Sequence, residues 1–124
     1  MKELADAERK AADSPQDSDA QYILGRICYG MGFYDKARVA LLAAGLDSRR
    51  RASVLGYLGR MHLKEGKFEL ALQDFCEAED DVIALSHRLD LLHHEVECLV
   101  KLGRHGEAER LQARITKLQG DLSP

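Results

Sequence analysis

The sequence predicts an all-α fold built from helix pairs that repeat about every 34 residues. A shift of the chain by 34 places brings Leu24-Gly25-Arg26 onto Leu58-Gly59-Arg60. Apolar residues recur at intervals of three and four within each repeat, which indicates two helices per unit. A period of this length is typical of stacked supersecondary units. The further matched pairs are Gly32/Gly66, Tyr34/Phe68, Asp35/Glu69, Ala37/Ala71, Leu41/Phe75 and Ala44/Ala78.

Gly32 and Gly66 mark the break between the two helices of a unit. Glycine has no Cβ, so it can leave a helix with a positive φ and let the chain reverse. We therefore expect a tight antiparallel helix pair around each of these two glycines.

Small residues recur on both helices of a unit. Gly25 and Gly59 lie on the first helices, and Ala37 and Ala71 lie one turn into the second helices. We expect each glycine to face the alanine of its own unit, which would let the two backbones approach closely.

A third unit emerges when three residues are inserted, and residues 79–86 are the expected place for them. Gly103 then matches Gly66. Glu95 stands where the preceding unit has Leu58, so we expect the first helix of this third unit to pack differently or to run longer.

The order of these residues resembles the tetratricopeptide repeat (TPR) family. A Leu-Gly pair is followed by a glycine seven residues on, an aromatic residue two later and an alanine three after that, over residues 17–119. The resemblance implies a TPR-like α-solenoid of three helix-turn-helix units, at about residues 17–50, 51–84 and 85–119. It also implies a protein-binding scaffold, with no enzymatic activity and no cofactor.

The helices at the two ends differ from those between them. Residues 35–46 and 68–80 are apolar almost all round, so we expect these two helices to be covered on both sides. Residues 105–119 carry a single apolar stripe, formed by Ala108, Leu111, Ile115 and Leu118, and predict a C-terminal cap before the tail 120–124. Residues 1–16 predict a short helix and linker, either a cap or the remnant of a preceding repeat.

The family resemblance implies that the first helix of each unit lines a concave groove that binds a partner. The residues expected to face this groove are Tyr22, Arg26, Tyr29, Arg60, Lys64, His93, Glu97 and Lys101. Two arginines one period apart, with nearby tyrosines, favour an extended and partly acidic peptide. The alternative is that these side chains only solvate the helix surface.

Other functions remain open at the level of sequence. The chain could self-associate as a homo-oligomer, dock within a larger protein, or hold peptides as a chaperone or secretion adaptor. The net charge of −3 gives no attraction for nucleic acid phosphates. No run of apolar residues is long enough to span a membrane, and we expect a cytoplasmic protein.

Metal and thiol chemistry are not expected. His94 and Cys98 are one helical turn apart, but no second pair of ligands accompanies them. The three cysteines, Cys28, Cys76 and Cys98, are widely spaced and are expected to be small buried residues. The run 49–51, three arginines, is expected at the end of the preceding helix, near its carbonyl groups.

Overall fold

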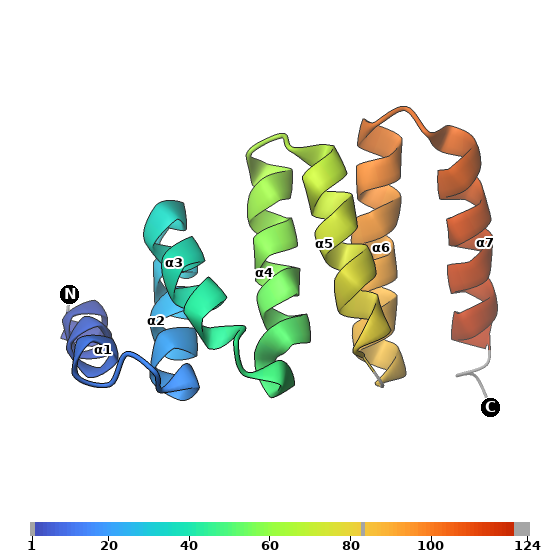
Figure 1. The fold of residues 1–124 in the computed structure, drawn as a ribbon. Coiled ribbons are helices and arrows are strands. Elements are labelled where there is room, and N and C mark those ends of the chain that lie inside the picture. The colour runs from blue at the N-terminus through green and yellow to red at the C-terminus, as the bar shows by residue number, and fades with distance from the viewer. Residues whose placement is uncertain (1, 83, 121–124) are drawn as a thin grey trace. The chain divides into compact units, whose positions relative to one another are not determined.

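The computed structural model describes residues 2–82 and 84–120, and within these residues it is helical without strands (Figure 1). The all-α prediction is confirmed. The chain forms two compact units, Met1–Tyr57 (unit 1) and Leu58–Pro124 (unit 2), whose boundary falls within the fourth α-helix. The helices are α1 (Lys2–Asp13), α2 (Ser18–Gly30), α3 (Tyr34–Ala44), a short 3-10 helix η1 (Ser48–Arg50), α4 (Arg51–Lys64), α5 (Phe68–Asp80), α6 (Leu85–Lys101) and α7 (His105–Gly120).

The helix pairs close through one recurring turn. Gly32, Gly66 and Gly103 have φ values of 80°, 76° and 76°. In the first turn the N–H of Phe33 donates to the carbonyl of Cys28 at 2.9 Å, and the equivalent bond is 2.8 Å long in the other two turns. This pattern is a glycine-terminated helix end that satisfies carbonyls left open by the helix. The predicted role of Gly32 and Gly66 is confirmed.

The residues that lie opposite Gly25 and Gly59, where the two helices of a pair approach closely, differ from the expected ones. A methyl group placed on Gly25 would lie 2.5 Å from Cγ of Leu41, and one placed on Gly59 would lie 2.6 Å from Cε1 of Phe75. The expectation that these glycines face alanines was wrong about the partner. A large side chain one turn further along the second helix fills the space above each glycine.

The expectation that α3 is covered on both sides was also wrong. Its Ala37, Leu41 and neighbouring alanines are buried, but Val39 is 73% exposed and Leu42 is 56% exposed. Leu46, just beyond the helix, is 90% exposed. The alanines and Leu41 complete the contact with the rest of the molecule, so the second apolar face remains uncovered.

The last helix pair agrees with the sequence. Ile115 of α7 is buried with Leu89 and Leu92 of α6, and Leu111 and Leu118 pack beside them. The predicted single stripe of α7 is confirmed. The helix α6 has 17 residues and α4 has 14, as expected for a longer first helix in the third unit. Ile83, within the predicted insertion, lies outside the described residues.

The N-terminal helix α1 packs against α2 mainly through two alanines, Ala7 and Ala11, which are its buried residues.

Cys28 and Cys98 are buried as expected, whereas Cys76 is exposed, so the expectation was wrong for that cysteine. In the described part of the chain, no helix is both long and apolar enough to cross a membrane.

Candidate protein-binding surface

All four tyrosines of the sequence meet in unit 1, and we call this group the tyrosine cluster: Tyr22, Tyr29, Tyr34 and Tyr57. The ring of Tyr29 stacks on Tyr34 at 5.8 Å and meets Tyr57 edge-on at 5.1 Å. Tyr57 also meets Tyr22 edge-on at 6.2 Å. Each tyrosine is half-buried, so the rings support one another and still present a surface to solvent.

Two arginines extend this aromatic surface. The guanidinium carbon of Arg50 lies 4.4 Å from the ring centroid of Tyr22, and that of Arg26 lies 5.7 Å from the same centroid. Arg50 also forms an ion pair with Asp19 in the first turn of α2. A cation over a tyrosine face is attracted by the ring quadrupole. The surface therefore combines rigid aromatic area with positive charge.

The segment before α4 is held against the start of α2. Ser18 donates its hydroxyl to Asp47 at 2.8 Å, and Asp47 also accepts from Arg49 at 2.9 Å. The bonds from Arg49 and Ser18 hold the pKa of Asp47 well below its usual range. Arg49 and Arg50 thus bind carboxylates, so the expected placement beside helix carbonyls was wrong for these two arginines.

The structure brings together three of the eight residues expected in the groove. Tyr22, Arg26 and Tyr29 lie on α2 within the tyrosine cluster. The other five belong to unit 2, with Arg60 and Lys64 on α4 and with His93, Glu97 and Lys101 exposed on successive turns of α6. Their participation in a common groove stays a prediction.

Three members of the surface were missed by the sequence reasoning: Tyr34, Arg50 and Tyr57. Tyr34 starts the second helix of its pair, Arg50 lies before a first helix, and Tyr57 points back from α4 to α2. One signal could have found the two tyrosines. All tyrosines fall between residues 22 and 57, and the remainder of the sequence has none.

Unit 2 contains a buried carboxyl group. Glu95 of α6 is 5% exposed, its Oε1 accepts from the Sγ of Cys76 at 3.1 Å, and its Oε2 is buried with no partner among the described residues. Burial raises the pKa of Glu95 to about 7. Nearby, Arg114 of α7 donates to Glu79 of α5 at 3.1 Å.

Two histidines in unit 2 also have specific partners. Nδ1 of His62 lies 2.6 Å from Oδ2 of Asp74, which joins α4 to α5. Burial raises the pKa of Asp74, and the bond with His62 opposes that shift. His94 stacks on Phe75 at 4.9 Å. Burial and then the charge of Arg60 lower the pKa of His94.

Burial also shifts the pKa values of the three cysteine thiols. Burial raises the pKa of Cys28, and it raises those of Cys76 and Cys98 to about 12, so the reactive thiolate form is disfavoured in each case. Within residues 2–82 and 84–120, no group of three or more histidine, cysteine or carboxylate side chains is arranged to hold a metal ion.

A comparison with solved structures identifies the architecture. The structure of MamA AMB-1, a TPR-like protein, matches the chain with a TM-score of 0.80 and 21% sequence identity. The match covers 95% of this chain and 68% of that chain. The fold is therefore a TPR-like helical solenoid. No family model and no curated protein matches the sequence.

Proposed function

We propose that this protein is an interaction scaffold that binds an extended, partly acidic peptide on the tyrosine cluster and its two arginines. The observation that carries the proposal is the gathering of all four tyrosines with Arg26 and Arg50 on one half-buried surface. Tyrosine and arginine are the residues most often found at the energetic centres of protein interfaces. Rings that already support one another lose little further freedom on binding.

The arginines of this surface favour a peptide that carries carboxylates. Arg26 is exposed, and Arg50 is held by Asp19, so a peptide carboxylate can approach one cation without displacing an ion pair. Arg60 and Lys64 of α4 and the exposed His93, Glu97 and Lys101 of α6 belong to unit 2, and a part for them in binding the same peptide is proposed from the family resemblance alone.

The test is a selection of random extended peptides on the immobilised chain, followed by fluorescence anisotropy of each selected peptide. We expect enrichment of aspartate and glutamate, and a loss of affinity of about tenfold or more for Arg26→Glu and for Tyr29→Ala. Lys117→Glu, which makes the same charge change on the exposed side of α7, serves as the control. Binding that survives both substitutions in α2 would rule out this surface.

Arg60→Glu separates the larger groove from the tyrosine cluster. A loss of affinity comparable to that of Arg26→Glu would extend the binding surface into unit 2. An unchanged affinity would confine the peptide to α2 and the start of α4.

Self-association is the second candidate function, and the exposed apolar residues of α3 favour it. Val39 and Leu42 are spaced at i and i+3 on α3 and share one uncovered face, and Leu46 is exposed just beyond the end of that helix. Light scattering on the purified chain and on Leu42→Lys tests this function. A dimer that the substitution dissociates would make self-assembly the leading function.

A further inference from the structure

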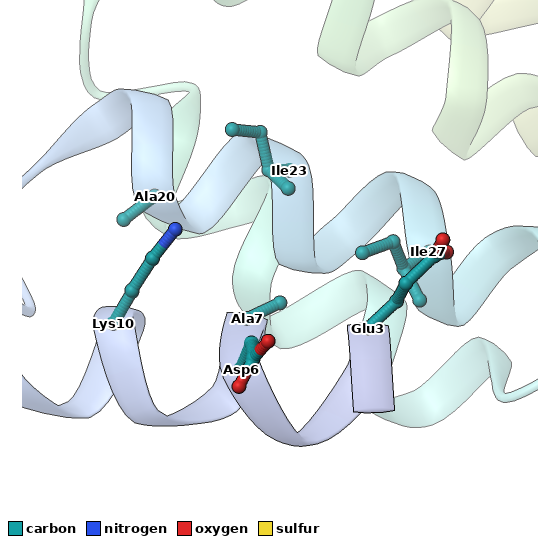
Figure 2. A pocket seen from close by; sticks show the side chains of 7 residues that line it. All are labelled: Glu3, Asp6, Ala7, Lys10, Ala20, Ile23 and Ile27. Carbon is teal, nitrogen blue, oxygen red and sulfur yellow. The ribbon is translucent and has the colours of Figure 1, made fainter. Parts of the chain in front are cut away.

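A second surface of unit 1 lies on the flank of α2 next to α1. It is an open cavity of about 250 Å³ whose floor is apolar and whose rim is charged (Figure 2). This volume is below the range of about 300–1,000 Å³ that is usual for small-molecule sites. The residues that line it are Glu3, Asp6, Ala7, Lys10, Ala20, Ile23 and Ile27.

The internal repeat allows this flank of α2 to be compared with the equivalent flank of α4, the first helix of the next repeat. Ile23 is 52% exposed, and a shift of 34 residues places it on Tyr57 of α4. Tyr57 is half-buried, because its ring packs edge-on against Tyr22 and Tyr29 of α2. In α4, the flank that carries this position therefore packs against another first helix, α2.

The neighbouring positions differ in burial in the same direction, and Val54 lies beside Gly45 at the end of α3. Ala20 and Ile27 are half-buried, whereas their counterparts one period later, Val54 and Met61, are buried. The floor of the cavity thus corresponds to three positions that are each more buried in α4 than in α2. An apolar side chain from a docked helix would complete the cover.

The contacts within unit 1 also give the direction of such a helix. Arg50, just before α4, meets Asp19 at the start of α2, and Tyr57 further along α4 meets Tyr29 further along α2. The two first helices therefore run parallel. A helix that took the equivalent place beside α2 would run parallel to α2 as well.

The charged rim fits this direction. Figure 2 shows Lys10 beside Ala20, toward the start of α2, and Glu3 beside Ile27, toward its end. A parallel helix would place its N-terminal turn near Lys10 and its C-terminal turn near Glu3. Helices favour acidic residues in the first turn and basic residues in the last turn, so its charges would match the rim.

We propose that this cavity docks an amphipathic α-helix of a partner protein, parallel to α2, with an apolar residue over Ile23. The docked helix has acidic residues in its first turn, facing Lys10, and basic residues in its last turn, facing Glu3. The site is separate from the tyrosine cluster, which lies on another side of α2, and it does not depend on peptide binding there.

The experiment uses two labelled synthetic helices of about 15 residues with the same composition and the same leucine stripe. The first carries glutamates in its first turn and lysines in its last turn, and the second has these charges exchanged. By fluorescence anisotropy we expect the first to bind about fivefold or more tightly than the second. Ile23→Glu should weaken both by about tenfold or more. The double variant Glu3→Lys/Lys10→Glu should reverse the preference.

Two controls separate this site from the rest of the protein. Tyr29→Ala should leave the binding of both helices unchanged, and the unfolding midpoint of Ile23→Glu should equal that of the wild type because Ile23 is exposed. Equal affinity for the two helices, no binding of either, or binding that survives Ile23→Glu would overturn the proposal. A dimer of the free chain that Ile23→Glu dissociates would also overturn it, since a second copy would then occupy the cavity.

Discussion

The thiol of Cys76 donates to the carboxyl group of Glu95 across the α5–α6 contact, at 3.1 Å. Glu95 stands where the preceding unit has Leu58, so an ionisable group occupies a position that elsewhere in the repeat is apolar. If Glu95 were ionised, one carboxylate oxygen would accept only from the Cys76 thiol, which is a weak donor. The other oxygen would be buried without a described partner. The protonated acid therefore suits the site better than the carboxylate.

This site predicts a stability that falls as the pH rises. An unfolded glutamate loses its proton near pH 4.5, whereas folded Glu95 keeps its proton up to about pH 7. The folded state thus binds more protons in this window, and the free energy of unfolding must decrease with increasing pH. Compared with Glu95→Gln, the wild type should lose up to about 3 kcal/mol between these pH values. Urea unfolding at a series of pH values measures the difference.

A neighbouring glutamate supplies the control for that measurement. Glu97→Gln removes a carboxyl group two residues further along α6, where the side chain is exposed. Its stability curve should run parallel to that of the wild type. If Glu95→Gln also runs parallel, Glu95 does not hold a proton in the folded state.

Two glycines of α4 predict opposite responses to the same substitution. The methyl group of Gly59→Ala would lie 2.6 Å from Phe75, a ring that is fully buried and stacked on His94. The ring must shift within the core to admit the methyl group, so we expect a loss of about 1–3 kcal/mol. Gly56→Ala meets nothing within 4 Å and should be neutral or stabilising by up to about 1 kcal/mol. Thermal unfolding of both variants checks the pair, and equal losses would contradict the assigned packing.

The glycine positions show which features of the fold could be predicted from the sequence. The period of 34 predicted the helix pairs and the positive φ of Gly32 and Gly66, because backbone demands repeat with the unit. It did not predict that Leu41 and Phe75 fill the space above Gly25 and Gly59, since several large residues of a second helix have suitable spacing. Packing partners depend on the distance and angle between helices, which a pattern along one chain does not contain.

The candidate binding surface was predicted only in part, for a related reason. Residues on one helix face, such as Tyr22, Arg26 and Tyr29, follow from helical periodicity alone. Tyr57 and Arg50 join them from the following repeat and the segment that leads into it. A contact between repeats requires the stacking geometry, and the sequence carried only the clustering of tyrosines before residue 58 as a hint.

Cys76 is predicted to react slowly despite its exposed position. Desolvation of the thiol and its bond to Glu95 raise the pKa of Cys76 from 9.0 to about 12. The thiolate fraction near pH 8 is therefore lower by a factor on the order of 1,000 than at the unshifted pKa. Alkylation by iodoacetamide, followed by mass spectrometry, should be slow in the folded protein and fast in urea. Fast labelling of Cys76 in the folded state would show that its thiol is open to water.

The two adjacent leucines of α3 predict very different losses when each is shortened to alanine. Leu41 is 0% exposed and fills the space above Gly25, so Leu41→Ala leaves a cavity and should cost about 2–5 kcal/mol. Leu42 is 56% exposed, and Leu42→Ala should change the stability by no more than about 0.5 kcal/mol. Urea unfolding below the concentration of any self-association measures both. Similar losses for the two variants would mean that α3 is covered on both faces, as its apolar composition alone predicted.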